Sequence, residues 1–174
     1  MKTEATPVVP RGAAEGLKRE AYRVVEESVA ALLEGEDDWI AALATTVTEL
    51  HHAFAYFDWT GFYRVKGDRL LVIGPYQGGH GCLRIPFDKG VCGACARSKQ
   101  TLIVPDVHAF EGHIACASST LSEIVIPVLS PSGELLAVLD VDSDDPAAFT
   151  REDADGLERI CRTLVRQVSS PCAS

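Results

Sequence analysis

The order of the predicted secondary structure elements is the feature that most constrains the fold of this 174-residue chain. Apolar residues recur at helical spacing in two stretches near the amino terminus and in one near the carboxyl terminus. The middle of the chain instead contains short, strand-like runs separated by glycine and proline turns. Helices at both ends of a run of strands are typical of the α+β class, in which helices flank one antiparallel sheet. The length suits a single domain.

Three helices are predicted from the apolar stripes, which we expect to pack into the core. The first spans residues 13–33, and the second follows an acidic break in which Asp37 or Asp38 is a suitable N-cap. The third begins at Thr150, where the spacing to Asp153 resembles a capping box with Asp in place of Glu. The expected apolar face of the second helix is Ile40, Leu43, Val47, Leu50, His51 and Phe54, and that of the third is Leu157, Ile160, Cys161, Leu164 and Val168.

The two ends of the chain differ in composition from the rest. Residues 1–12 contain two prolines and one glycine without periodicity, so we predict a disordered tail there, a domain over 13–168, and a second tail over 169–174. Residues 1–12 also lack the apolar run of a signal peptide. No apolar run approaches the roughly 20 residues of a membrane span. The sequence therefore predicts a cytoplasmic protein.

The overall charge argues against two classes of partner. The net charge is -9, and an acidic chain repels phosphate backbones and anionic membrane surfaces. Nucleic-acid and membrane binding are therefore not expected. The content of 47% hydrophobic and 24% charged residues is that of a globular protein, which argues against a disordered or fibrous chain.

Six cysteines are unusual in a chain expected in a reducing compartment, where a disulfide framework is not maintained. Cys161 lies on the apolar face of the last predicted helix, so we expect a buried thiol that packs like a small hydrophobe. Cys172 lies in the polar tail after Pro171, so we expect an exposed thiol.

The other four cysteines, Cys82, Cys92, Cys95 and Cys116, fall in one central stretch among small residues. Three interpretations are open. They could be small core residues. They could bind zinc, because Cys92-Gly-Ala-Cys95 has the spacer of a metal knuckle, although a second knuckle is missing. They could also perform thiol redox chemistry, which requires a nucleophilic thiolate and a resolving thiol nearby.

Three carboxylates form a second candidate cluster. Asp140 and Asp142 are two residues apart on a predicted strand, so both point to one face. Close carboxylates hold a proton at neutral pH, and a protonated carboxyl can help an oxygen to leave as water. Glu123 on the partner strand lies opposite Asp140 if the hairpin has a two-residue turn, or on the other face if Gly133 forms a bulge. The alternative is a solvated sheet edge.

The remaining candidates are aromatic and acidic residues. Trp59, Tyr63 and Tyr76 suit either the core or an apolar box for a methyl or thioether group. A loop histidine more often forms hydrogen bonds than performs catalysis, so His108 and His113 are supporting candidates. A further group of acids is expected on the solvated surface, where negative charge suits the start of the last helix: Asp144, Asp145, Glu152, Asp153, Asp155 and Glu158.

A series of different short motifs follows in order along the chain. They are Trp59-Thr-Gly-Phe-Tyr63, Gly74-Pro-Tyr-Gln-Gly78, Cys82-Leu-Arg-Ile-Pro-Phe87, Gly90-Val-Cys-Gly93, Asp106-Val-His108, Gly112-His-Ile-Ala-Cys116, Ser122-Glu-Ile-Val125, Val138-Leu-Asp-Val-Asp-Ser143 and Phe149-Thr150. Together they resemble the free methionine-(R)-sulfoxide reductases, which are stand-alone GAF-domain enzymes. The resemblance covers residues 39–168. It implies a six-stranded antiparallel sheet flanked by helices, with a closed pocket for one free amino acid.

The resemblance also implies roles for the cysteines. Cys116 would attack the sulfoxide sulfur, and a sulfenic acid and free methionine would result. Cys82 would then form a disulfide with it, and Cys92 would be a second resolving or relay thiol. The assignment of the nucleophile between Cys116 and Cys92 stays open. Cys95 is extra relative to the family pattern, which leaves a disulfide with Cys92 as an alternative.

The other implied roles belong to carboxylates, aromatic rings and a protein partner. Glu123, Asp140 and Asp142 would donate the proton, hold the sulfoxide oxygen or bind the substrate amine, and Trp59 and Tyr63 would form the wall around the substrate side chain. Thioredoxin would reduce the disulfide, so neither a bound cofactor nor a metal is expected. A homodimer is a further expectation, although packing within the chain explains the first helix equally well. The alternative function is a non-enzymatic GAF module that senses a small ligand.

Overall fold

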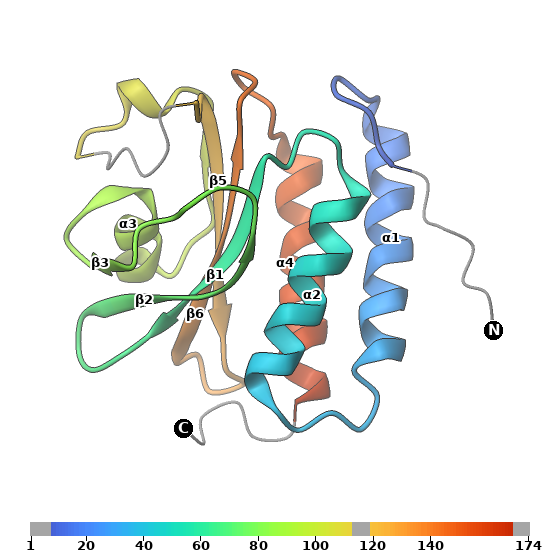
Figure 1. The fold of residues 1–174 in the computed structure, drawn as a ribbon, viewed down its shortest axis with the longest axis horizontal. Coiled ribbons are helices and arrows are strands. Elements are labelled where there is room, and N and C mark those ends of the chain that lie inside the picture. The colour runs from blue at the N-terminus through green and yellow to red at the C-terminus, as the bar shows by residue number, and fades with distance from the viewer. Residues whose placement is uncertain (1–7, 113–118, 169–174) are drawn as a thin grey trace.

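A six-stranded antiparallel sheet lies at the centre of the structure, a computed structural model that describes residues 8–112 and 119–168 (Figure 1). The strand order is β3-β2-β1-β6-β5-β4. The strands are β1 (Trp59–Val65), β2 (Leu70–Gln77), β3 (Arg84–Pro86), β4 (Leu102–Val104), β5 (Ser122–Leu129) and β6 (Leu135–Ser143). The helices are α1 (Glu15–Leu32), α2 (Trp39–Ala53), α3 (Gly90–Ser98), α4 (Arg151–Gln167) and a 3-10 turn at Val107–Ala109. The α+β architecture predicted from the element order is confirmed.

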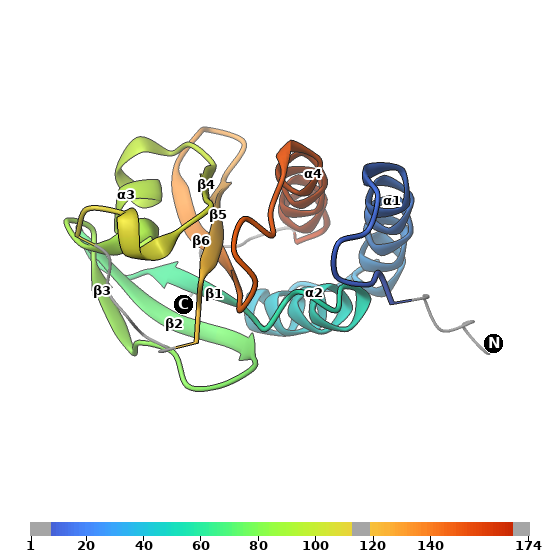
Figure 2. The ribbon, with the colours of Figure 1, turned by 90° about the horizontal axis from the view of Figure 1, so that it is seen from above.

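The helices divide between the two faces of the sheet (Figure 2). Helices α2 and α4 pack on one face, and α1 packs on α2 and α4 as an outer layer. Helix α3 covers part of the other face, against β5 and β6. Two apolar clusters result, one on each side of the sheet. None of the helices in the described part of the chain is long and apolar enough to cross a membrane.

The predicted caps are present. The Asp38 carboxylate accepts a hydrogen bond from the Ala41 N–H at 2.8 Å, so Asp38 is the N-cap of α2. Thr150 and Asp153 form the predicted capping box at the start of α4. The expectation for Ile40 was wrong, because its side chain is 39% exposed. Trp39, one turn before the buried Leu43, packs partly against the core instead, and this turns Ile40 outward.

A buried ion pair joins α1 to α4. Lys18 Nζ lies 2.7 Å from Asp153 Oδ2, and the two side chains are only 5% and 0% exposed. The hydroxyl groups of Tyr22 and Tyr56 both donate to Asp153 Oδ1, at 2.8 and 2.6 Å. Asp153 was expected on the solvated surface, and this expectation was wrong. Its carboxylate is buried because one cation and two hydroxyl groups compensate for the lost water.

Part of the expected amino-terminal tail is packed against the domain. Val9 is 1% exposed, and its backbone N–H donates to the Ala53 carbonyl at 2.8 Å while its carbonyl accepts from the Ala55 N–H at 2.9 Å. Residues 8–12 therefore correct the prediction of disorder over 1–12. The rest of that tail, residues 1–7, and the predicted carboxyl-terminal tail, residues 169–174, lie outside the described residues.

Replacing Lys18 with Met is expected to lower the free energy of unfolding by about 3–5 kcal/mol, because Asp153 then remains buried without its cation. Urea denaturation measures this difference. The control is Arg23→Met on the same helix, whose ion pairs with Glu20 and Glu27 are exposed to solvent and are expected to contribute little to stability. Equal effects of the two substitutions would contradict a stabilising role for the buried pair.

Candidate active site

The sheet face beneath α3 brings the three predicted carboxylates together with Trp59. Residues directly opposite one another in an antiparallel pair point to the same face. Asp142 on β6 lies opposite Trp59 on β1 and opposite Glu123 on β5. Asp140, two residues earlier, lies opposite Gly61. The carboxylates therefore come from two adjacent strands, β5 and β6, and β1 places Trp59 beside them.

The hairpin between β5 and β6 has neither of the two registers considered from the sequence. Glu123 faces Asp142 rather than Asp140, and the register shifts between Val128 and Leu129. The pairing differs from that of a two-residue turn because the connection is longer, with the Ser130 N–H donating to the Glu134 carbonyl at 2.8 Å. The displacement is by two residues in total, so Glu123 keeps the face shared with the two aspartates.

Helix α3 places a thiol over this cluster. Cys92 is 3% exposed, and its sulfur, one oxygen of Glu123 and one oxygen of Asp140 all lie within 4.8 Å of one another. Cys95, one turn later, is fully buried, and its sulfur contacts the Val125 carbonyl oxygen at 3.7 Å. Both cysteines of the Cys92-x-x-Cys95 pair therefore face the sheet.

Burial changes the protonation of the carboxylates. It raises the pKa of Glu123 and of Asp142 well above their ordinary values, and neighbouring negative charge adds to the effect. Burial also raises the pKa of Asp140, to about 6, although hydrogen bonds from Cys92 and Glu123 oppose this shift. Asp140 Oδ1 is buried and has no hydrogen-bond partner among the described residues. The cluster therefore retains protons near neutral pH.

The same environment keeps the Cys92 thiol protonated. Burial raises the pKa of Cys92 well above its ordinary value, and the charges of Asp140 and Glu123 raise it further. Burial likewise raises the pKa of Cys95. A thiolate is the nucleophilic form of cysteine, so this environment disfavours Cys92 as an attacking group.

An aromatic box adjoins the carboxylates. The ring of Trp59 stacks on Tyr63 and on Tyr76, with centroid distances of 5.8 and 5.4 Å, and its Nε1–H donates to the Gly79 carbonyl at 3.0 Å. A Cβ at Gly61 would lie 2.5 Å from both Trp59 and Tyr76, so the close stack requires glycine there. The predicted pair of Trp59 and Tyr63 is thus in contact, and Tyr76 adds a third ring.

Cys82 lies beside this box. A Cβ on the preceding residue, Gly81, would lie 2.9 Å from the Trp59 ring and 3.0 Å from Tyr63 Oη, so the chain passes directly over the two rings. Cys82 is half-buried and disulfide-bonded. Tyr63 in turn lies close enough to Asp140 and Cys92 for their charges to raise its pKa, after burial as the main cause. Tyr63 therefore links the box to the carboxylate cluster.

The remaining cysteines and histidines divide into described and undescribed residues. Cys92, Cys95 and Cys161 are free thiols. Cys161 is 2% exposed on the α4 side of the sheet, as predicted, and burial raises its pKa to about 12. His108 is exposed, and its backbone N–H donates to the Asp106 carboxylate at 2.9 Å. Three predicted residues lie outside the described residues: Cys116, the proposed nucleophile, His113 and Cys172.

The donor geometry does not suit a zinc knuckle. A knuckle needs two thiolates that converge on one ion, but Cys95 contacts the Val125 carbonyl and Cys82 is in a disulfide. Among the described residues, the group close enough to share a metal is instead Cys92, Glu123 and Asp140, which is one thiol and two carboxyl groups.

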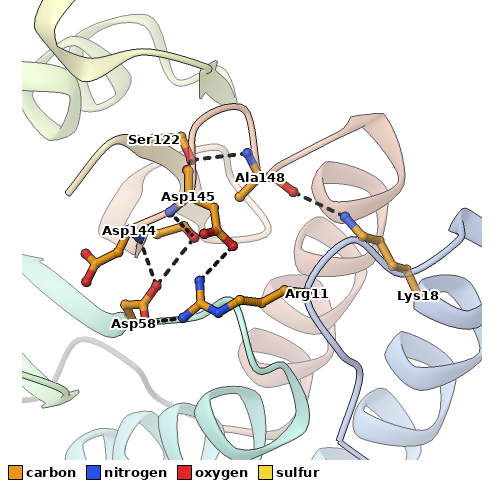
Figure 3. Close-up of polar contacts among 8 residues, drawn as sticks. Arg11, Lys18, Asp58, Ser122, Asp144, Asp145 and Ala148 are labelled. Atoms are coloured by element: carbon orange, nitrogen blue, oxygen red, sulfur yellow. Dashed lines mark hydrogen bonds and ion pairs between the residues drawn. The ribbon is translucent and has the colours of Figure 1, made fainter. Parts of the chain in front are cut away.

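Arg11 and Asp58 support the site and were not predicted (Figure 3). Arg11 Nη2 lies 2.6 Å from Asp58 Oδ1, and Nη1 lies 2.7 Å from Asp145 Oδ2. Asp58 Oδ2 accepts a hydrogen bond from the Asp144 N–H at 2.8 Å, and the Asp58 N–H donates to the Asp142 carbonyl at 2.9 Å. Arg11 thus ties the start of β1, next to Trp59, to the end of β6.

Ser122 extends these contacts to β5. Its hydroxyl donates to the Asp145 carbonyl at 2.6 Å and accepts from the Ala148 N–H at 3.2 Å (Figure 3). The Ala148 carbonyl in turn accepts from Lys18 Nζ at 3.3 Å. No local pattern predicts these contacts, because Arg11 and Asp145 are 134 positions apart. Gly61 did carry a signal, since a glycine within a strand often marks a close approach of another group.

The architecture is that of a GAF domain, and residues 38–168 match the GAF-domain family. The chain therefore belongs to that family. Three comparisons narrow the assignment. The chain is 43% identical to GAF domain-containing protein A of Dictyostelium discoideum, over 86% of this chain and 94% of that protein. It is 38% identical to the free methionine-R-sulfoxide reductase of Escherichia coli (strain K12), over 88% of this chain and 92% of that protein.

The third comparison is with a solved structure. The X-ray structure of the free methionine-R-sulfoxide reductase from Neisseria meningitidis in complex with its substrate has a TM-score of 0.81 and 38% identity to this chain. The match covers 95% of this chain and 97% of that one. Within the GAF-domain proteins, the chain thus belongs to the free methionine-R-sulfoxide reductase family.

Replacing Asp140 with Asn is expected to stabilise the protein at pH 8. The pKa of Asp140 rises from its ordinary 3.8 to about 6 on folding, so its favourable contribution is complete below about pH 4 and is lost as the pH rises through 6. The gain at pH 8 should be on the order of 2–3 kcal/mol and should vanish below pH 4. Urea denaturation across this pH range measures it.

The matched control for this titration is Asp88→Asn, which changes an exposed aspartate before α3 and should leave the stability nearly unchanged. A destabilised D140N variant at pH 8 would contradict the sign of the effect.

Proposed function

We propose that this protein reduces free methionine (R)-sulfoxide to methionine with its own thiols, and that thioredoxin reduces the resulting disulfide. The observation that carries the proposal is the juxtaposition of the disulfide-bonded Cys82, an aromatic box and a buried cluster of protonated carboxyl groups. The membership of the chain in the reductase family supports it.

The proposed pocket suits the two ends of the substrate. The rings of Trp59 and Tyr63 offer an apolar surface for the methyl sulfoxide group and the chain that carries it. The carboxylates of Glu123, Asp140 and Asp142 offer hydrogen-bonding groups for the sulfoxide oxygen or the substrate amine. Asp140 Oδ1 has no hydrogen-bond partner within residues 8–112 and 119–168, and this supports the role, because a buried polar atom gains most from a ligand that completes its hydrogen bonds.

The proposed reaction starts with the attack of Cys116 on the sulfoxide sulfur. A carboxyl group of the cluster donates a proton to the oxygen, and this oxygen passes to the Cys116 sulfur as its bond to the substrate sulfur breaks. Methionine leaves, Cys116 becomes a sulfenic acid, and the proton of the Cys116 thiol restores the carboxyl group. The Cys82 thiol then attacks the sulfenic acid, which forms a disulfide and releases water. In total, two thiols and one sulfoxide give one disulfide, one methionine and one water.

Cys92 has a different proposed role. Its raised pKa disfavours attack on the substrate, so we assign it as a second resolving or relay thiol. The extra Cys95, one turn further along α3, is the alternative partner for Cys92 in a disulfide.

The proposed cycle requires an external dithiol and no bound cofactor. Thioredoxin is the proposed reductant, and the cytoplasm is the proposed location, because a reducing compartment maintains the thiols between turnovers. A homodimer also remains a proposal. Leu17 and Leu32 on α1 are 49% and 56% exposed, which leaves apolar surface for a second copy, and sedimentation measures the association.

The first test uses the reduced protein without an added reductant. Mixing it with methionine (R)-sulfoxide should release one equivalent of methionine per chain and lower the protein mass by two hydrogens, as intact mass spectrometry detects. A non-enzymatic sensor would bind the ligand without either change. Sulfoxide that is recovered intact, from protein whose thiols were reduced at the start, would reject the proposal.

The second test separates the cysteine roles. Cys116→Ser should abolish even a single turnover, because no nucleophile remains. Cys82→Ser should still release one equivalent of methionine but should lose the rapid formation of the disulfide. Cys161→Ser is the matched control, since this buried thiol lies on the other side of the sheet. If Cys92→Ser alone abolishes the single turnover, then Cys92 is the nucleophile.

A further inference from the structure

We propose that Leu83 is the docking residue through which a reductant protein of the thioredoxin class reaches the disulfide of Cys82. This inference rests on the proposed function, and it concerns the partner that closes the catalytic cycle. Leu83 directly follows Cys82 in the loop that leads into the edge strand β3.

The exposure of Leu83 is the first observation. Its side chain is 67% exposed, more than any other large apolar side chain in the described part of the chain. The loop is nevertheless anchored, because the Leu83 carbonyl accepts a hydrogen bond from the Ile73 N–H on β2 at 3.1 Å. A fixed apolar side chain that points into solvent gains free energy when a partner buries it.

The position of the disulfide is the second observation. Cys82 is half-buried between the exposed Leu83 and the aromatic box, so one side of the loop faces the substrate region and the other faces solvent. A small dithiol needs no docking surface to reach such a sulfur. A protein dithiol must bring its own surface into contact with the residues around Cys82, and Leu83 is the nearest apolar contact along the chain.

The local charge is the third observation. The chain has a net charge of -9, but residues 66–89, which contain Cys82, carry more cationic than anionic side chains. The cationic ones are Lys66, Arg69, Arg84 and Lys89, and the anionic ones are Asp68 and Asp88. This part of the sheet edge therefore does not repel an acidic partner protein as the rest of the chain does.

The reduction of the Cys82 disulfide at this surface takes two thiol–disulfide exchange steps. A thiolate of the reductant attacks the Cys82 sulfur and forms a mixed disulfide, and the former partner of Cys82 leaves as a thiol. The second thiol of the reductant then attacks the mixed disulfide and releases the Cys82 thiol. The reductant is oxidised to a disulfide, and this chain recovers both thiols.

The experiment compares two reductants with the full-length protein. Turnover of methionine (R)-sulfoxide is measured with dithiothreitol, and with thioredoxin, its reductase and NADPH at increasing thioredoxin concentration. Leu83→Ser should lower kcat/KM for thioredoxin about tenfold, the loss expected for one well-buried apolar contact, and should leave the dithiothreitol rate unchanged. The conservative Leu83→Met should retain the wild-type value with both reductants.

The matched control is Ile40→Ser, which removes an isoleucine that is 39% exposed on α2, on the other side of the sheet, and should change neither rate. A Leu83→Ser variant that keeps the wild-type kcat/KM for thioredoxin would overturn the docking proposal alone. So would a parallel loss of the dithiothreitol rate, because Leu83 would then act within the reaction. Wild-type protein that turns over with neither reductant would instead overturn the proposed function, and the docking proposal with it.

Discussion

The pairing of β6 with β1 on one side and β5 on the other is the constraint on which the candidate site depends. These two ladders place Asp142 between Trp59 and Glu123, and Asp140 next to Gly61. A shift of one residue in either ladder would move a carboxyl group or the indole to the opposite face, where α2 and α4 pack. The candidate site therefore lies on three adjacent strands in the middle of the sheet, and α3 adds Cys92 above it.

The two faces of the sheet bury different kinds of side chain, and these have opposite effects on stability. On the helical face, apolar side chains form a continuous cluster, and the one buried charge pair, among the residues that the structure describes there, is compensated by two tyrosine hydroxyl groups. On the other face, three carboxyl groups and a thiol are buried close together, and burial is the main cause that raises the pKa of each. Such a cluster lowers stability at neutral pH, and proteins commonly tolerate this cost at functional sites. The large apolar cluster behind the sheet allows it.

Local patterns in the sequence were sufficient for the elements and for most of the candidate residues. The capping box at Thr150 and the shared face of Asp140 and Asp142 depend on contacts between near neighbours, which periodicity reveals. The register of Glu123 depends on the shape of a hairpin turn, and the burial of Asp153 depends on a lysine 135 positions away. Contacts that depend on a turn shape or on a distant residue do not produce a periodic pattern in the sequence. The roles of the cysteines came from resemblance to a family, because spacing alone left zinc, packing and redox chemistry open.

The part of the chain that matches the GAF-domain family begins at residue 38, whereas Arg11 and Lys18 precede it. Both cations nevertheless contact the segment that follows β6, and Arg11 also holds the aspartate before Trp59. The segment that matches the GAF-domain family is therefore shorter than the segment that holds the candidate site together. A gene fragment that begins at residue 38 would encode every strand of the sheet. It would lack Arg11 and Lys18, the two cations that hold the segment after β6 in place near Trp59 and Asp142.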